Sequence, residues 1–203
     1  MDYKVALKQM DFMKKNSKDI RLAAEGWDSD WKILIATILS AQTRDETTIK
    51  VAEELFKKYS SLKKLANAKI EDVEVIISSL NFYRNKAKNI VGCAKAIVKD
   101  FGGEVPKDEE LLIKLPGAGR KTAGVLLSEV GEDGIAVDTH VAYISRKLGW
   151  TNKNTPDKIQ EDLKKMFPKK YWSRINPTLV RFGKSWTSRK KKDEVLERVK
   201  LIN

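Results

Sequence analysis

A lysine that follows a glycine-containing turn is the first residue of this chain whose position suggests chemistry. Lys121 comes two residues after Gly119, within the stretch LPGAGRKTA that covers residues 115–123. Pro116 ends one apolar helical run, and Lys121 opens another. Gly117 and Gly119 let the backbone turn tightly and leave its amides bare, so the start of the second helix can bind a phosphate oxygen. The stretch therefore offers a phosphate-binding turn and an amine side by side.

The chemistry of Lys121 depends on its position at the helix start. Most lysines in such positions are solvated surface charges, and that is the alternative interpretation. Two cations, Arg120 and Lys121, are nonetheless poorly placed for stability at the positive end of a helix. The same setting favours the uncharged amine, which is a nucleophile for imine formation. We therefore predict a nucleophilic role for Lys121.

A carboxylate further along the chain could serve such an amine. Asp138 follows the apolar segment 134–137 and precedes a helical run that carries Val141 and Ile144. A structural role for Asp138 is to cap that helix. The two roles are compatible, because a cap uses one carboxylate oxygen and leaves the other available. Sequence spacing alone does not place Asp138 beside Lys121.

The elements that must position these residues are helical almost throughout. The clearest apolar stripe covers residues 87–101, keeps the period of a helix and stops at Gly102-Gly103. No strand-like alternation, low-complexity tract or strong repeat occurs in the sequence, so the predicted fold class is all-α. Further helical patterns cover residues 7–14, 31–39, 49–59, 73–80, 109–115, 121–130, 141–148, 159–166, 179–182 and 193–202.

The composition excludes several classes of protein. The chain has 203 residues, enough for one large or two small domains, and its net charge of +12 favours a polyanionic partner over a merely soluble basic surface. Cys93 is the only cysteine, which excludes a disulfide framework and a cysteine-based metal site. No apolar run approaches the length of a membrane span, and the N-terminus lacks a signal-peptide core. We expect a soluble, intracellular protein without a membrane partner.

Several motifs resemble those of the helix-hairpin-helix DNA glycosylases and, among them, the endonuclease III family. LPGAGRKTAG at residues 115–124 and IAVDTHV at 135–141 look like the hairpin and the aspartate motif of that family. A hairpin alone is shared with many DNA-binding proteins, whereas the combination is specific. The other similar segments, in family order, are Leu39-Ser40-Ala41-Gln42-Thr43 with Asp45, residues 81–90 and residues 180–184.

The resemblance implies two helical subdomains that flank a DNA-binding cleft. Residues 22–134 would form a six-helix barrel with the hairpin, and residues 1–21 and 135–203 would form the other subdomain. Lys121 would face Asp138 across the cleft and attack C1′ of a damaged nucleotide, expelling the base and leaving an imine. β-Elimination would then cut the strand on its 3′ side. Asp138 would help deprotonate the lysine or stabilise positive charge on the sugar.

The resemblance also assigns contacts with damaged double-stranded DNA. Gln42 would help fill the space left when a base leaves the stack, and Phe82 would act as an apolar wedge. Their alternatives are an amide that satisfies backbone groups and a partly buried loop aromatic. His140 belongs to the aspartate motif, and a structural hydrogen bond is favoured there over acid–base work. The candidate DNA-binding residues are Gln42, Phe82, Gly117, Gly119, Arg120, Thr122, His140, Arg189 and Lys190.

The C-terminal end departs from the family. Most relatives carry four cysteines there, spaced C-x6-C-x2-C-x5-C, that hold a [4Fe–4S] cluster. One cysteine cannot hold such a cluster, so the expected cofactors are none, apart from a monovalent cation that the hairpin carbonyls could bind. The positions that correspond to the four cysteines are Thr187, Glu194, Glu197 and Asn203.

A final helix could replace the cluster. Residues 193–202 would pack Val195, Leu196, Val199 and Ile202 against the body of the protein. The basic run 189–192 precedes it, where the cluster loop of the family touches DNA phosphate. An ordinary solvated charge run is the alternative.

These observations predict a monomeric, DNA-associated enzyme of base excision repair, a bifunctional DNA glycosylase and AP lyase for oxidised pyrimidines such as thymine glycol. One alternative is an 8-oxoguanine or mismatch glycosylase of the same fold. Mismatch relatives typically lack a lysine at position 121, whereas 8-oxoguanine relatives use one. The other alternative is a DNA-binding module that has lost catalysis, which gives no reason for Lys121, Asp138 and Gln42 to coexist.

Overall fold

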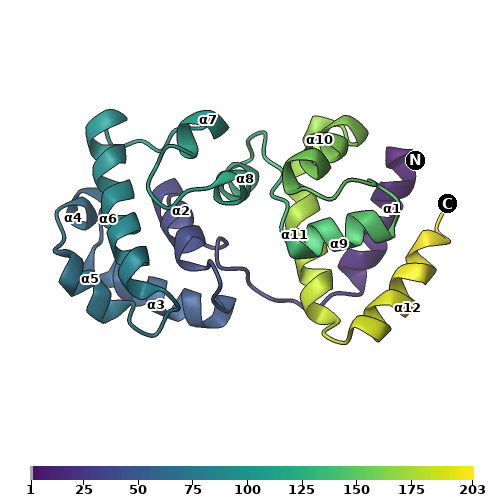
Figure 1. Ribbon diagram of the computed structural model, residues 1–203, viewed down its shortest axis with the longest axis horizontal. Helices are drawn as coiled ribbons and strands as arrows, with labels where there is room; N and C mark the ends of the chain where they lie inside the picture. Colours follow the sequence, from purple (N-terminus) through teal and green to yellow (C-terminus); the bar gives the residue numbers. More distant parts are fainter. Residues whose placement is uncertain (1) are drawn as a thin grey trace. The chain divides into compact units, whose positions relative to one another are not determined.

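The computed structural model describes residues 2–203, which fold into helices joined by loops (Figure 1). No strand is present in that range, and the predicted all-α class is confirmed. The chain divides into two compact units. The central unit is Arg21–Val130, and the terminal unit combines the residues up to Ile20 with those from Gly131 onward. The family resemblance places the corresponding limits at residues 22 and 134.

The central unit is built around α2, whose residues 33–39 are all buried. This helix is apolar on every side because α3, α6 and α8 all pack against it. The long helix α6 also packs against α4 and α5, and the four-residue α7 packs against α8 (Figure 1). The seven helices of this unit are α2 (Asp30–Leu39), α3 (Asp45–Lys58), α4 (Leu62–Ala66), α5 (Ile70–Ile76), α6 (Tyr83–Asp100), α7 (Glu109–Leu112) and α8 (Arg120–Glu129).

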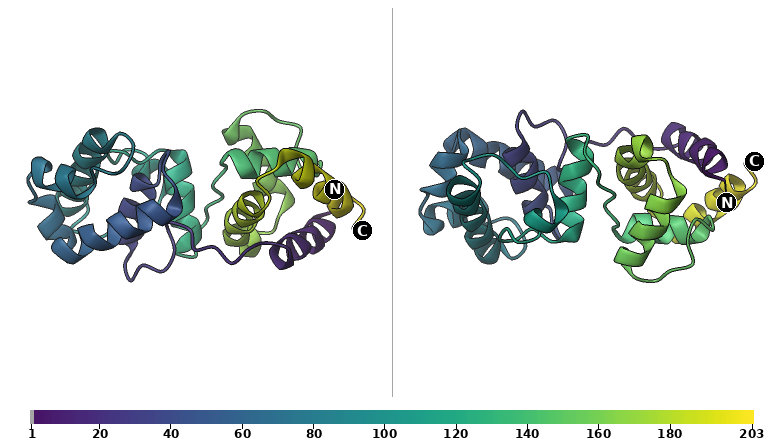
Figure 2. Two further views of the ribbon diagram at one scale, coloured as in Figure 1. Left: turned by 90° about the horizontal axis from the view of Figure 1, so that it is seen from below. Right: turned by 90° about the horizontal axis from the view of Figure 1, so that it is seen from above.

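The terminal unit joins α1 to the last four α-helices and the 3₁₀ helix among them. Helix α1 packs against both α11 and α12, so the two ends of the chain share one core (Figure 2). Met10 and Met13 of α1 and Phe182 of α11 are fully buried in this unit. The elements are α1 (Tyr3–Lys15), α9 (Thr139–Lys147), α10 (Pro156–Met166), the 3₁₀ helix η1 (Lys169–Tyr171), α11 (Trp172–Ser185) and α12 (Arg189–Lys200).

Helix α12 begins four residues before the expected start at residue 193. Its N-cap is Ser188, whose side chain accepts a hydrogen bond from the Lys191 amide at 3.5 Å. The basic run 189–192 is therefore the first turn of a helix, not a loop before it. Leu196 and Val199 are fully buried, as expected, whereas Val195 and Ile202 are only half-buried.

Polar contacts attach the start of α12 to α9. The Tyr143 hydroxyl donates a hydrogen bond to Asp193, and the Lys147 ammonium lies 3.5 Å from the same carboxylate. The guanidinium of Arg189 stacks 5.5 Å from the centroid of the Tyr143 ring. Throughout the part of the chain that the structure describes, no helix has both the length and the apolar character that a membrane crossing requires.

Candidate functional site

The turn between α7 and α8 brings Lys121 to the surface. Gly117 has a φ of +79°, and a Cβ at this position would lie 2.8 Å from the Cβ of Asn89. Both conformation and space therefore require glycine at residue 117. Gly119, the N-cap of α8, has an ordinary φ of −97°, and a Cβ there would meet nothing within 4 Å. Packing does not explain Gly119, and its distinctive contribution is a bare backbone at the helix start.

The first turn of α8 is strongly positive. It has no side-chain cap and no acidic residue, and it contains Arg120, Lys121 and Thr122. The Arg120 guanidinium lies 3.5 Å from Glu109 and 3.4 Å from Glu110 of α7, so its charge is partly compensated. Lys121 is exposed, and no ion pair within the fully described central unit involves it. An anion that approached this turn would meet uncompensated backbone amides and an available ammonium or amine.

Asp138 caps α9, as its sequence position predicts. Its Oδ1 accepts a hydrogen bond from the Val141 amide at 2.8 Å, and the side chain is half-buried. The segment that leads to it is also fixed, because Gln160 donates to the Ile135 carbonyl at 2.8 Å and Asn176 donates to the next carbonyl at 3.0 Å. The aspartate therefore has a defined orientation within the terminal unit. Lys121 belongs to the central unit.

His140 lies where two helices of the terminal unit approach closely. A Cβ on Gly183 of α11 would lie 2.2 Å from Nδ1 of the His140 ring, which no side chain could tolerate. The ring thus occupies space that only a glycine on α11 leaves open. This position is consistent with the structural role that the sequence favours for His140.

Gln42 and Phe82, the two residues expected to enter the base stack and called the candidate probes below, share an unusual backbone conformation. Gln42 has a φ of +53° and Phe82 a φ of +57°, and no other non-glycine residue in the range 2–203 has a positive φ. This conformation costs about 1–3 kcal/mol for each such residue and persists only where the surroundings impose it. Phe82 is 61% exposed, so it contributes little to the core. Strain and exposure at both positions are typical of residues that are kept for function.

The side-chain positions argue against the structural alternatives for these two residues. Gln42 is exposed, and its side-chain amide makes no hydrogen bond within the central unit; the bond at this residue is made by its backbone carbonyl. Phe82 is exposed rather than partly buried. Their roles as DNA contacts stay predictions.

Two further residues of this region were not singled out from the sequence. The Asn81 side chain donates to the Gln42 carbonyl at 2.6 Å. Lys86 is only 5% exposed, and its ammonium donates to the Leu39 carbonyl at 2.7 Å and to the Thr43 hydroxyl at 2.9 Å. A signal for Lys86 was present, because it lies four residues before Ile90 and thus on the apolar face of α6. A lysine on a buried face needs a partner.

Burial lowers the pKa of Lys86 from 10.5 to about 8, because the charged form loses its hydration. Between these values the unfolded chain holds the proton more strongly than the folded protein, so the free energy of unfolding should rise with pH. Relative to Lys86→Met, the wild type should gain about 1–2 kcal/mol between about pH 8 and pH 9.5. Urea unfolding of both proteins at both pH values measures this change, in which the contributions of other titrating groups cancel. A difference that stays flat or falls with pH would contradict the assignment.

The residues present do not fit an iron–sulfur cluster. Cys93 is fully buried in the core of the central unit, and burial raises the pKa of its thiol to about 12. The positions that correspond to the family cysteines are exposed and carry no thiol. Over residues 2–203, no three side chains of the His, Cys, Asp or Glu type gather in a way that could hold a metal ion.

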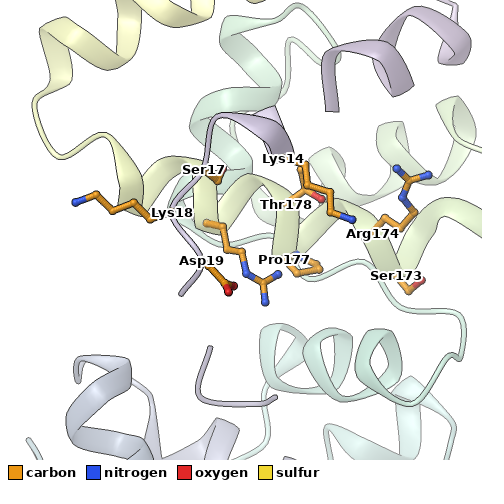
Figure 3. A pocket seen from close by; sticks show the side chains of 9 residues that line it. Lys14, Ser17, Lys18, Asp19, Ser173, Arg174, Pro177 and Thr178 are labelled. Atoms are coloured by element: carbon orange, nitrogen blue, oxygen red, sulfur yellow. The ribbon is translucent and has the colours of Figure 1, made fainter. Parts of the chain in front are cut away.

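A cavity of about 480 Å³ in the terminal unit is lined by none of these candidates (Figure 3). Two of its basic side chains already have partners: Arg174 pairs with Asp11 at 2.7 Å, and Arg181 donates a hydrogen bond to the Ile20 carbonyl at 3.0 Å. In Figure 3 the Lys18 side chain extends away from the other cations. The lining residues are Lys14, Ser17, Lys18, Asp19, Ser173, Arg174, Pro177, Thr178 and Arg181.

Comparison with known proteins identifies the family. Residues 35–169 match the HhH-GPD superfamily base excision DNA repair protein. The chain is 45% identical over 156 residues to endonuclease III of Thermotoga maritima, covering 76% of this chain and 73% of that protein. It resembles a non-covalent endonuclease III–DNA complex with a TM-score of 0.83 and 34% identity, covering 94% of this chain and 89% of that one. A trapped endonuclease III–DNA covalent intermediate, an estranged-adenine complex, gives a TM-score of 0.81 and 35% identity, covering 91% and 87% of the two chains.

The chain therefore belongs to the HhH-GPD superfamily of base excision DNA repair proteins. It is a DNA glycosylase of base excision repair. Its relatives carry the name endonuclease III, which denotes a DNA N-glycosylase and AP lyase, so the predicted enzyme class is confirmed. The individual roles of Lys121 and Asp138 stay predictions.

Proposed function

We propose that the protein is a bifunctional DNA glycosylase and AP lyase that removes oxidised pyrimidines of the thymine glycol type from damaged double-stranded DNA. It would act as a monomer inside the cell, in association with DNA in the cytoplasm or nucleoid. The observation that carries the proposal is the exposed Lys121 on the uncapped first turn of α8, directly after the open backbone of Gly119. The similarity to a trapped endonuclease III–DNA covalent intermediate supports a reaction that passes through a covalent bond to DNA.

The proposed reaction begins with the Lys121 amine. It attacks C1′ of the damaged nucleotide, the C1′–N bond breaks, and the base leaves with the bonding electrons and takes up a proton. The sugar ring opens, and an imine links Nζ to C1′. Loss of a proton from C2′ then expels the 3′ phosphate by cleavage of the C3′–O bond, and water releases the lysine. Asp138 would accept the ammonium proton or stabilise positive charge on the sugar, using the carboxylate oxygen that does not cap α9.

The proposed DNA contacts surround this chemistry. The amides of the α8 turn and the Thr122 side chain would hold a backbone phosphate, and a monovalent cation at the hairpin carbonyls stays a prediction. Gln42 and Phe82 would occupy and wedge open the base stack. Arg189 and Lys190 would add phosphate contacts from the first turn of α12, where positive charge opposes the helix dipole; the Arg189 guanidinium also stacks on the Tyr143 ring.

Duplexes that carry one lesion each test the proposal. Thymine glycol and 5-hydroxycytosine are expected to be excised and the strand cut, with borohydride trapping a protein–DNA adduct. Uracil and 8-oxoguanine duplexes are expected to stay intact. Preferential excision of 8-oxoguanine would replace the proposed substrate by the alternative within the family. An absence of both excision and adducts on every duplex would overturn the proposed reaction.

Gly119→Ala is expected to weaken DNA binding while lowering the free energy of unfolding by no more than about 1 kcal/mol, because alanine is a poorer N-cap than glycine. The backbone there has room and an ordinary φ, so a methyl group would obstruct only a ligand that approaches the helix start. Binding to an abasic-analogue duplex and urea unfolding measure the two effects. Gly117→Ala is the contrasting variant, since its positive φ and the nearby Asn89 predict a loss of stability. Unchanged binding by Gly119→Ala would contradict the phosphate contact.

The proposed enzyme works without an iron–sulfur cluster. Its single thiol lies in the core of the central unit, so protein purified without oxygen is expected to be colourless and to retain excision activity after treatment with an iron chelator. A brown preparation whose iron and sulfide contents match would contradict this prediction.

A further inference from the structure

The two strained residues of the central unit come from different loops that are tied together. Gln42 lies between α2 and α3, and Phe82 lies between α5 and α6 as the N-cap of the latter. Asn81, the neighbour of Phe82, donates to the Gln42 carbonyl at 2.6 Å. One short hydrogen bond thus connects the backbone of one candidate probe to the residue beside the other.

Lys86 makes a second connection between the same loops. Its backbone amide donates to the Phe82 carbonyl at 3.0 Å, and its side chain donates to the Leu39 carbonyl at 2.7 Å and the Thr43 hydroxyl at 2.9 Å. Those two acceptors bracket the loop that contains Gln42. The ammonium also satisfies a carbonyl of the last turn of α2, where a positive charge is favourable. The Lys86 side chain therefore ties the first turn of α6, which begins directly after Phe82, to the loop that contains Gln42.

Stability does not explain why this position carries a lysine. The ammonium is buried and donates to neutral oxygens, so its charge is removed from water without a compensating carboxylate among the bonds that it makes. An apolar side chain of similar volume would avoid that cost. What the lysine provides, and an apolar residue would not, is two directed hydrogen bonds at fixed distances.

We propose that Asn81 and Lys86 are positioning residues that lock Gln42 and Phe82 into one rigid pair, so that both side chains enter the duplex together when the damaged base leaves the stack. Left-handed conformations at a glutamine and a phenylalanine require surroundings that impose them, and these bonds join the two sites. The inference rests on the proposed function. It adds to that function a coupling between two probes on separate loops.

If Gln42 and Phe82 act as a coupled pair, the variants should react more slowly only with substrates whose base stack must be opened. Lys86→Met and Asn81→Ala are expected to slow excision of thymine glycol from duplex DNA by about 10- to 100-fold in single-turnover assays. Cleavage of an abasic site in single-stranded DNA has no base to extrude and should change less than about threefold. Fluorescence of 2-aminopurine opposite the lesion should report less unstacking by both variants than by the wild type.

Controls make the experiment decisive. Lys95→Met removes an exposed lysine elsewhere on α6 and should behave as the wild type. Asn81 is exposed, so Asn81→Ala keeps the test valid even if Lys86→Met does not fold. Adding Asn81→Ala to a Phe82→Ala protein should not lower the rate of thymine glycol excision any further, because Phe82→Ala already removes one member of the pair.

The outcomes separate this inference from the proposed function. A wild type that excises no lesion overturns the proposed function itself. An active wild type accompanied by Asn81→Ala and Lys86→Met proteins with wild-type excision overturns the coupling alone. Equal losses on the lesion duplex and on single-stranded abasic DNA would also overturn it, because they would indicate a general structural defect.

Discussion

The Lys121→Gln protein is expected to form no adduct with an abasic duplex in the presence of borohydride, whereas the wild type becomes covalently attached to it. Glutamine lacks the basic lone pair from which an imine forms, so the yield of adduct should fall by at least about 10³-fold. Stability should change by no more than about 0.5 kcal/mol, because Lys121 is exposed and makes no ion pair within its unit. Gel electrophoresis of the trapped species and urea unfolding measure the two effects.

Lys121→Arg separates the loss of the imine-forming amine from the loss of the positive charge. It keeps a cation on the first turn of α8, so duplex binding should be retained, yet arginine does not form the imine under these conditions. Both variants should therefore lose the adduct while only the glutamine protein binds more weakly. An adduct that survives in both would leave the lyase reaction standing and assign it to another amine.

Asp138→Asn is expected to slow base excision by about 10²- to 10⁴-fold with little change in duplex binding or folding. Asparagine caps helices about as well as aspartate, and its Oδ1 can still accept from the Val141 amide. The substitution thus removes the charge and the proton acceptor but keeps the local structure. Single-turnover excision and a binding titration on the same lesion duplex separate the two effects.

Asp138→Ala supplies the comparison for the cap. It removes both functions and should reduce the free energy of unfolding by about 1 kcal/mol, the usual contribution of an N-cap. If Asp138→Asn unfolds as readily as Asp138→Ala while its excision per folded molecule is unchanged, Asp138 is only a cap.

Local features of the structure followed well from the sequence. Apolar periodicity predicted the all-α class and the α-helices other than the short α4, and the position of Asp138 before a helical run predicted its cap. Pro116 and Gly117 indicated a turn, which the positive φ of Gly117 accounts for. These features depend on neighbouring residues, whose preferences are visible in a single sequence.

Long-range contacts did not follow from the sequence. Lys86 binds a carbonyl 47 residues away in the sequence, and the local preferences of lysine do not predict such a partner. Phenylalanine has no preference for the left-handed region, so the backbone of Phe82 could not be foreseen either. The start of α12 was missed because its first turn is basic, which is unfavourable at a helix N-terminus, while the Ser188 cap lies just before it.

The shared core of α1, α11 and α12 has a consequence for how the protein is made. The central unit is continuous in the chain and can fold on the ribosome as soon as Val130 has emerged. Helix α1 is synthesised before the central unit, yet its buried residues Met10 and Met13 must wait for α11 and α12, which are synthesised after that unit. Helix α1 thus packs into its core only after the central unit can already have folded, and a chain cut before α11 would leave its apolar face available to chaperones and proteases.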